Sequence, residues 1–321
     1  MIEPIVDPMF MIDGVTPAVV DPRLVAILVS PAAIVGSFVW GLLWGSFANV
    51  VIWRVPRGMS VVRPRSACPG CGAPIAWYDN IPALSYLLLR GRCRRCRAPL
   101  SLRYLIVELL GGFIAFAFYM LHVIVPLIQG GGPGLAAWLL WTVFGLALLI
   151  ITYTDLDLWV IPNAVVLPVA AVGLGVAALD PAILGVDPIE AVVAAAGGYG
   201  LIAGLRWVYL KRRGIEALGL GDGKLLAMVG AFCGASGLFW TVAAGSIQGL
   251  LLAVPLLLVG RRVANSDLKE VHGDDPALGE EDPSAGVMGV RIPFGPFLAI
   301  AALEFALLRE SILDGLYWLL G

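Results

Sequence analysis

Long apolar stretches constrain the fold of this chain more than any other feature. A transmembrane helix needs about 20 largely apolar residues. Stretches that meet or approach this length are Leu24–Ile52, Tyr104–Ile128, Leu135–Tyr153, Asn163–Leu179, Ile189–Leu210, Leu225–Gly260 and Pro293–Leu313. The stretch Leu225–Gly260 is about twice as long as one span, and its interruption at Gly234-Ala235-Ser236-Gly237 predicts a turn between two helices. We therefore expect an all-α polytopic membrane protein with about eight transmembrane helices.

Composition excludes a soluble protein. The chain is 60% hydrophobic and 14% charged, whereas soluble domains carry about 25% charged residues and rarely expose large apolar patches. The net charge of −2 gives no reason to expect nucleic-acid binding. The first 22 residues contain four acids and no basic cluster, so a cleavable signal peptide is not expected.

The basic residues predict the orientation in the membrane. Ten arginines and the single acid Asp79 lie between Arg54 and Arg103, which places this segment in the cytoplasm by the positive-inside rule. The expected organisation is an extracytoplasmic tail (1–23), a first span (24–53), a cytoplasmic cysteine domain (54–103), a core of further spans (104–260), a cytoplasmic loop (261–292), and a last span with the C-terminus (293–321). Within that loop, the acidic residues 267–282 have the composition of a solvated linker.

Four cysteines form two closely spaced pairs. Cys68 and Cys71, and then Cys93 and Cys96, make a CxxC…CxxC pattern with 21 residues between the pairs. This spacing is typical of a structural zinc site with four thiolate ligands. Two disulfides or four unligated thiols are the alternatives, and the reducing cytosol disfavours disulfides. Cys233 lies in a span and is expected to be a small buried apolar residue. No internal sequence repeat is evident.

Acidic residues within or beside the spans are candidates for function, because charged groups are costly in a bilayer. Asp155 and Asp157 lie at the cytoplasmic end of the third span, Asp222 at the start of the sixth, and Glu108 one turn into the second. All lie at a similar depth, which permits them to converge. Helix capping or a polar loop position is the alternative, and we favour it for Asp157. A proton-coupled transporter would also use acids within the membrane.

Asp155 and Asp222 together suggest aspartyl chemistry. Two carboxyls that share one water do not both ionise easily, so one keeps a proton. The ionised group takes a proton from water while the protonated group hydrogen-bonds the scissile carbonyl. The glycines Gly219 and Gly221 lack a Cβ atom and permit close approach of an extended substrate backbone.

A series of short motifs stands in order along most of the chain. They are Gly45–Pro56, Pro64–Gly72, Asp79–Pro82, Leu84–Tyr86, Arg90–Cys93, Ser101–Glu108, Asp155–Asn163, Gly219–Lys224 and Ile292–Phe297. Together they resemble the bacterial type IV prepilin peptidases. The GxGD motif that ends at Asp222 also resembles that of presenilin-type intramembrane proteases. The chain departs from the prepilin peptidase pattern at Leu105, where proline is common, and at Asn163, where aspartate is frequent.

The resemblance implies a substrate and a mechanism. Asp155 and Asp222 are then the catalytic aspartates, and Gly219, Gly221, Lys224 and Glu108 support them or bind substrate. This family cuts the short basic leader from prepilins and pseudopilins at the cytoplasmic face of the inner membrane. Many members then methylate the new N-terminal amine with S-adenosylmethionine.

A methyl-transfer site is expected inside the membrane protein itself, because the sequence lacks a GxGxxG strand–helix signature. The candidate residues are Gly45, Ser46, Asn49 and Arg54, with Glu108 nearby. Alternative roles are helix packing for Gly45 and Ser46 and, for Arg54, a positive charge that orients the protein in the membrane.

Three other functions remain open. The first is a peptidase without methylation, in which the cysteine domain docks the leader. The second is a non-enzymatic scaffold for pilus or secretion assembly, against which the retention of both Asp155 and Asp222 argues. The third is a proton-coupled transporter, which gives no reason for a four-cysteine domain.

Overall fold

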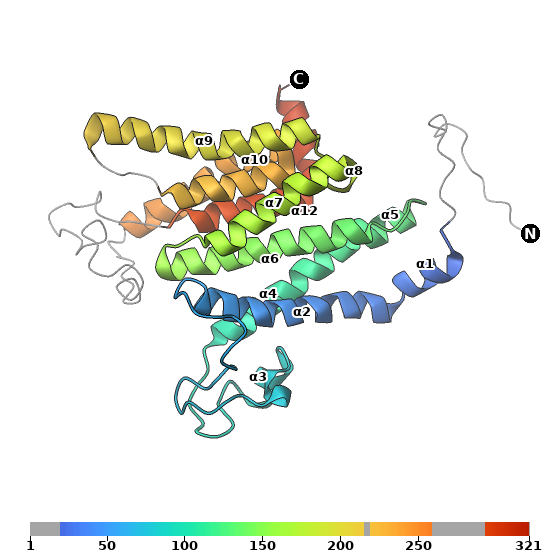
Figure 1. Cartoon of the computed structure of the whole chain (residues 1–321). Coiled ribbons are helices and arrows are strands. Elements are labelled where there is room, and N and C mark those ends of the chain that lie inside the picture. Colours follow the sequence, from blue (N-terminus) through green and yellow to red (C-terminus); the bar gives the residue numbers. More distant parts are fainter. Residues whose placement is uncertain (1–19, 215–218, 259–292, 321) are drawn as a thin grey trace, which may run out of the picture.

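The computed structural model describes residues 20–214, 219–258 and 293–320, and their regular elements are helices. Figure 1 shows the long helices lying roughly alongside one another. The elements are α1 Pro22–Leu28, α2 Pro31–Arg54, η2 Trp77–Asn80, α3 Leu84–Leu88, α4 Leu102–Tyr119, η3 Met120–Ile124, α5 Val125–Ile128, α6 Leu135–Leu158, α7 Asn163–Leu179, α8 Pro181–Leu184, α9 Pro188–Arg213, α10 Leu220–Leu258 and α12 Gly295–Leu320.

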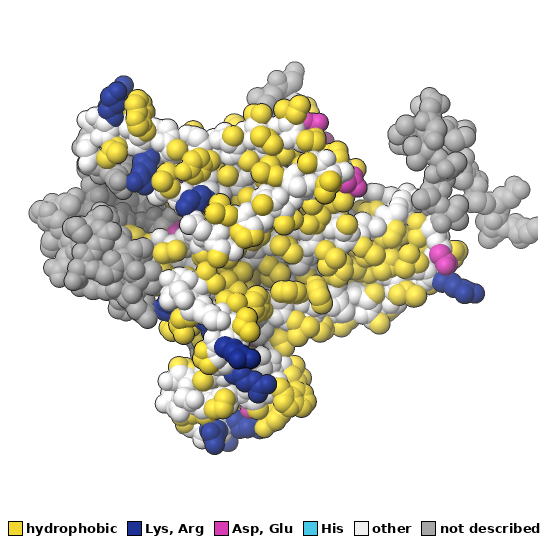
Figure 2. Space-filling model, in the orientation of Figure 1, with side chains coloured by type: hydrophobic (Ala, Val, Ile, Leu, Met, Phe, Trp, Pro, Cys, Tyr) yellow, Lys and Arg dark blue, Asp and Glu magenta, His cyan; other side chains and the backbone are white. Residues whose placement is uncertain are grey.

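Within the described residues, five helical segments are long and apolar enough to cross a membrane: Pro31–Arg54, Leu102–Ile128, Leu135–Leu158, Pro188–Arg212 and Leu220–Leu252. The apolar helix α7 is shorter. Large apolar side chains are exposed on the outer faces of these helices, as Figure 2 shows, and such a surface suits lipid rather than water. The prediction of an all-α membrane protein is therefore confirmed.

Three helix boundaries differ from those predicted. The first apolar stretch is not continuous, because α1 ends at Leu28 and Pro31 begins α2 with Ser30 as its N-cap. Proline has no N–H to donate and suits a first helical position. Helix α6 extends past Tyr153 to Leu158, and α10 begins at Leu220. Asp155 and Asp222 consequently lie inside helices, near their ends.

Two groups of helices meet along α6. Helices α2 and α4 pack together, while α10 packs on α7, α9 and α12. Helix α6 contacts α2 and α4 on one side and α12 on the other (Figure 1). The segment between α2 and α4, which carries the four cysteines, lies beside one end of this helix pair (Figure 1). The ends of α6 and α4 are therefore neighbours at the place where the candidate site residues lie.

Glycines bring the backbones of α2 and α4 into direct contact. A Cβ atom on Gly45 would lie 2.9 Å from both Cα and O of Glu108, and one on Gly111 would lie 2.8 Å from Cα of Gly45. Small residues at helix crossings permit this close approach in membranes. The crossing fixes Glu108 relative to α2 through backbone contacts.

The interruption expected in the sixth apolar stretch is found at Gly234. Its backbone is not helical (φ 67°, ψ −164°), and it divides α10 into two helices. The backbone N–H of Ala235 donates to Oε1 of Glu190 at 2.9 Å, so α9 satisfies a donor at the start of the second helix. The neighbouring Cys233 is fully buried, as predicted.

Candidate active sites and metal centre

Asp155 lies near the end of α6 and is buried, with 6% of its surface exposed. Its Oδ2 accepts a hydrogen bond from the backbone N–H of Gly295 at 3.0 Å. Gly295 is the first residue of α12, and the first N–H groups of a helix have no partner within it. The helix end favours a negative group there. Gly295 belongs to a motif noted in the sequence, but sequence reasoning did not assign it to the site.

Asp222 lies in the first turn of α10, and its carboxyl is within range of electrostatic interaction with that of Asp155. The side chain of Ile161 packs where these elements meet. A Cβ atom on Gly221 would lie 3.2 Å from Cβ of Ile161, and one on Gly295 would lie 3.3 Å from its Cδ1. The structure thus brings the two aspartates together from α6 and α10, beside the start of α12.

The other residues predicted near this pair have different partners. Lys224 Nζ donates to Oδ1 of Asn163 at 2.8 Å and links α10 to α7. Gly219 is exposed just before α10 begins. Asp157 forms an ion pair with Arg103 at the start of α4, and the same guanidinium lies 4.8 Å from the ring centroid of Tyr153. Arg103 therefore joins the end of α6 to the start of α4.

A cavity of about 500 Å³ lies between α2, the start of α4 and the cysteine segment. Its lining includes Ser46, Asn49, Arg54 and Glu108, which are four of the five residues predicted near a methyl-transfer site. Gly45, the fifth, lies at the crossing of α2 and α4. Glu108 was grouped in the sequence with the aspartates as well, and the structure places it in this cavity. Tyr86, Tyr104, Trp53 and Met59 contribute to the wall.

Glu108 is held in a fixed orientation within the cavity. Its Oε2 accepts a hydrogen bond from the backbone N–H of Ala83 at 2.7 Å, and the side chain of Ser46 lies beside its carboxyl. Ala83 adopts a positive φ of 57° with ψ −48°, which is costly for a residue with a Cβ atom. Such strained residues occur preferentially at functional sites.

Asn49 and Arg54 shape the cavity through backbone carbonyls. Asn49 Nδ2 donates to O of Tyr104 at 3.0 Å, which ties α2 to the start of α4. Arg54 is buried, and its guanidinium donates to O of Ser60 at 3.0 Å and to O of Pro64 at 2.8 Å. Arg54 therefore fixes the loop that follows α2. It also contributes to the positive charge from which the orientation in the membrane was predicted.

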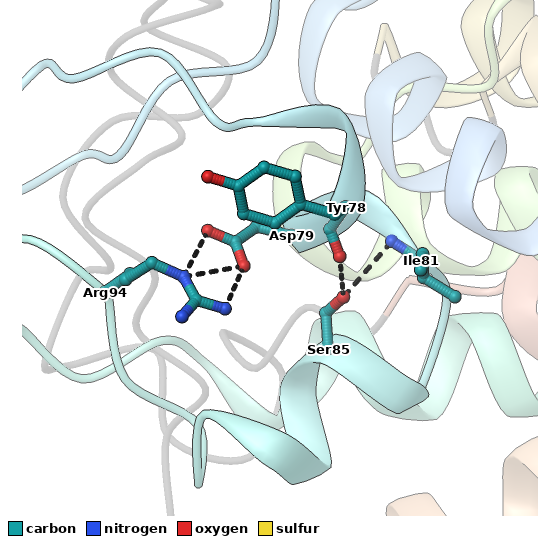
Figure 3. A network of polar contacts seen from close by, with 5 residues as sticks. All are labelled: Tyr78, Asp79, Ile81, Ser85 and Arg94. Carbon is teal, nitrogen blue, oxygen red and sulfur yellow. Dashed lines mark hydrogen bonds and ion pairs between the residues drawn. The ribbon is translucent and has the colours of Figure 1, made fainter.

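Asp79 also lines the cavity, but its carboxylate is committed to an ion pair. Figure 3 shows both of its oxygens facing the guanidinium of Arg94, with N···O distances of 2.6–2.9 Å. Beside it, the Oγ of Ser85 donates to O of Tyr78 at 3.0 Å and accepts from the N–H of Ile81 at 3.2 Å. These bonds order the segment that leads to Ala83.

The four predicted zinc ligands lie together. The sulfur atoms of Cys68, Cys71, Cys93 and Cys96 all lie within 4.8 Å of one another, and all are free thiols. Four sulfurs at about 2.3 Å from a central zinc ion are about 3.8 Å apart when the geometry is tetrahedral. The Sγ atoms of Cys68 and Cys96 are 3.8 Å apart. The donor set and its spacing therefore fit a tetrahedral zinc ion.

Each cysteine pair lies on the same kind of turn, which reveals a repeat that the sequence analysis did not detect. The backbone N–H of Cys68 donates to O of Ala73 at 2.9 Å, and that of Cys93 donates to O of Ala98 at 2.9 Å. An isolated antiparallel bridge closes each turn. The shared pattern is Cys-x-x-Cys-x-Ala-Pro followed by isoleucine or leucine. Only a few positions are identical between the two stretches, so the repeat becomes recognisable only when the two turns are compared.

The two turns differ at the residue after the second cysteine. Gly72 occupies this position in the first turn with φ 67°, and Arg97 occupies it in the second with φ 61°. Glycine adopts such angles at little cost, whereas a residue with a Cβ atom is strained there. The second turn is therefore the less favourable of the two.

The cysteine thiols have contrasting acidities. The backbone N–H groups of Cys96 and Arg95 lower the pKa of Cys93 to about 6. The backbone N–H of Ala98 favours the thiolate of Cys96, but burial and the neighbouring cysteine side chains outweigh it and raise the pKa of Cys96 to about 11. Four clustered thiols do not all ionise readily by themselves, and a divalent cation supplies the missing positive charge.

Comparisons with known proteins show which family this chain is similar to. Residues 39–122 match the bacterial peptidase A24 N-terminal domain, and residues 142–254 match the type IV leader peptidase family. The first range contains the cysteines and the cavity residues, and the second contains both aspartates.

Several similar proteins are named prepilin leader peptidase/N-methyltransferase. The one from Myxococcus xanthus is 36% identical, with 87% of this chain and 91% of that protein covered. Those from Aeromonas hydrophila and Pseudomonas aeruginosa are 34% and 32% identical and cover 86% and 84% of this chain, and 90% and 88% of their own lengths. No solved structure shows significant similarity. The chain belongs to the type IV leader peptidase family.

Proposed function

We propose that this protein removes the leader peptide from prepilins and pseudopilins at the cytoplasmic face of the inner membrane. It then methylates the new amino terminus with S-adenosylmethionine. Family membership supports both activities, because relatives that match most of the chain carry both in their names. The observation that carries the peptidase assignment is the meeting of Asp155 and Asp222 at the ends of two helices.

The aspartate pair performs peptide hydrolysis by sharing protons with one water. The ionised carboxyl removes a proton from the water, while the protonated carboxyl donates a hydrogen bond to the scissile carbonyl. The water oxygen adds to the carbonyl carbon, the C–N bond breaks, and the nitrogen leaves with a proton. The N–H of Gly295 fixes one oxygen of Asp155 during this sequence. Gly219 leaves room beside Asp222 for an extended substrate backbone, whereas the missing side chain of Gly221 accommodates Ile161.

The cavity between α2 and α4 is the proposed methyl-transfer site. Its volume of about 500 Å³ falls in the range of small-molecule sites, which is roughly 300–1,000 Å³. Its apolar and aromatic walls surround a few polar groups, among them Ser46, Asn49 and Glu108. S-adenosylmethionine supplies an electrophilic methyl group on sulfur. Ser46 and Asn49 provide polar atoms to hold it, and Arg54 keeps the adjoining loop in place.

The four cysteines are proposed to hold a structural zinc ion. Each turn contributes two thiolates, and the ion ties together the segment that covers the cavity. The segment has little apolar core of its own, so metal binding contributes directly to its folding. Leader docking on this segment is disfavoured, because the ten arginines among residues 54–103 repel a basic leader.

We further propose a topology of eight spans, with the two aspartates and the cysteine segment on the cytoplasmic side. The spans are α2, α4 with η3 and α5, α6, α7, α9, the two parts of α10, and α12. Residues 1–23 then begin outside, and the acidic loop 261–292 is cytoplasmic. Residues 1–19 and 259–292 lie outside the described residues. The positive-inside rule supports this orientation.

The proposal is tested by mass spectrometry of a co-expressed prepilin. Wild-type enzyme is expected to yield a leaderless, methylated amino terminus. Asp155→Asn and Asp222→Asn are each expected to reduce cleavage by about 10²–10⁴-fold, because general acid–base catalysis contributes that much. The control is Asp314→Asn, an exposed acid on α12. Near-normal cleavage in either site variant would refute the catalytic pair, and a leaderless product without the added methyl mass would refute methylation.

A further inference from the structure

The two acidic side chains that line the cavity differ in whether a described basic residue forms an ion pair with them. Among its described lining residues, the acids are Asp79 and Glu108 and the bases are Arg54 and Arg65. Asp79 is paired with Arg94. Glu108 has neutral neighbours: its carboxyl accepts a hydrogen bond from the backbone N–H of Ala83 and lies beside the side chain of Ser46. A positively charged group that enters the cavity therefore meets one acid that is not already held in an ion pair by a described residue.

The position of Glu108 is unusually well determined. Its backbone contacts Gly45 at the crossing of α2 and α4, so α2 fixes the position of Glu108. The strained Ala83 directs an N–H to Oε2, and the adjoining turn is ordered by Ser85. Groups that act on a reacting atom are held in this way, through packing and surrounding hydrogen bonds.

The cavity also lies close to the place where a new amino terminus forms. Tyr104 lines the cavity, and the preceding residue, Arg103, forms the ion pair with Asp157. Asp157 is two residues beyond Asp155 on α6. Because Arg103 and Tyr104 are consecutive, their Cα atoms are about 3.8 Å apart. One pair of adjacent residues on α4 thus connects the cavity to the helix that carries a predicted catalytic aspartate.

Methylation of an amine requires its lone pair. The amino terminus has a pKa of about 8 and is mainly an ammonium ion at neutral pH. We propose that Glu108 binds this ammonium group of the cleaved pilin and accepts a proton from it. The amine nitrogen then forms a bond to the methyl carbon as the carbon–sulfur bond breaks, and the electron pair of that bond goes to the sulfonium sulfur. This inference rests on the proposed methylation and assigns it a proton acceptor.

The test uses full-length enzyme, a leaderless pilin with a free amino terminus, and S-adenosylmethionine. Glu108→Gln keeps the shape of the side chain but removes its basicity. Its methylation rate at pH 7 is expected to fall by about tenfold, because only about one amine in ten is already deprotonated at that pH, with normal cleavage of a prepilin. The rate is expected to recover as the pH rises toward 9, because solvent then deprotonates the amine. Wild type is expected to show a much flatter pH profile.

Two further variants make the result specific. Glu108→Asp retains a carboxylate and is expected to keep a wild-type pH profile at a lower rate. Asp314→Asn removes an exposed acid on α12, away from the cavity lining, and is expected to keep that profile as well. A wild-type rate and profile in Glu108→Gln would overturn the inference. Loss of S-adenosylmethionine binding by Glu108→Gln would overturn it too, because the residue would then be a cofactor ligand. Absence of methylation by the wild type would instead refute the proposed function.

Discussion

Gly295 offers a direct test of the geometry around Asp155. A Cβ atom at this position would lie 2.6 Å from Oδ2 and 3.1 Å from Cγ of Asp155. Gly295 is not among the glycines with positive φ, so Gly295→Ala introduces no backbone strain. The substitution acts through the contact alone, and the carboxyl must move away from α12.

The size of the effect follows from that displacement. Close contacts between carbon and oxygen are about 3.3 Å, so the carboxyl oxygen must retreat by about 0.7 Å and its hydrogen bond to the Gly295 N–H is distorted. A misplacement of about 1 Å can reduce catalysis about 10²-fold. We therefore expect kcat/KM for prepilin cleavage to fall about 10²-fold, which corresponds to about 2.7 kcal/mol in the activation free energy.

The assay is leader removal from a purified prepilin, with methylation of a pre-cleaved pilin measured in parallel. Cleavage is expected to fall while methylation stays near the wild-type rate. Gly315→Ala is the matched control, because it lies on the same helix and its Cβ would meet nothing within 4 Å. Wild-type cleavage by Gly295→Ala would refute the contact with Asp155 as a requirement for catalysis. Equal loss of both activities would indicate misfolding rather than a local effect.

The remaining predictions concern the cysteine turns. Cys96→Ser is expected to abolish zinc retention and expose residues 66–100 to limited proteolysis, because the loss of one of four thiolate ligands weakens a site that organises the segment; metal analysis showing one equivalent of zinc in this variant would contradict the assignment. Arg97→Gly is expected to stabilise the second turn by about 0.5–1 kcal/mol by relieving the positive φ, and zinc release to a chelator should be slower. Gly72→Ala, the reverse change in the first turn, should release zinc faster than the wild type. Release at the wild-type rate by both variants would show that backbone strain in the turns does not control zinc release.

Hydropathy predicted the helical architecture because lipid requires long apolar helices whose backbone groups bond internally. The helix ends were less predictable. Asp155 was expected just after its span, but α6 continues until Trp159 adopts a left-handed conformation with φ 53°. Nothing in the local apolar pattern marks that conformation, because tryptophan rarely adopts it.

Contacts between distant segments account for what the sequence did not predict in the sites. Gly295 bonds Asp155 across 140 residues of sequence, and a glycine in an apolar motif carries no polar signal of such a role. Glu108 was recognised as an acid within the membrane, but only the position of Ala83, between the two cysteine pairs, shows which cavity it faces. The clustering of the four cysteines was predictable because the spacing of metal-binding thiols is a local property of the sequence.

The ion pair between Arg103 and Asp157 links the cavity to the helix of Asp155, and this closeness has a kinetic consequence for the proposed two-step processing. A pilin whose leader has just been cut is still held in the bilayer by its own apolar helix, next to both proposed sites. For such a tethered group the effective concentration is in the millimolar range, far above that of free pilin returning by diffusion. Methylation therefore competes with release of the cut pilin rather than with a new encounter, and unmethylated mature pilin is expected to stay scarce even when substrate greatly exceeds enzyme.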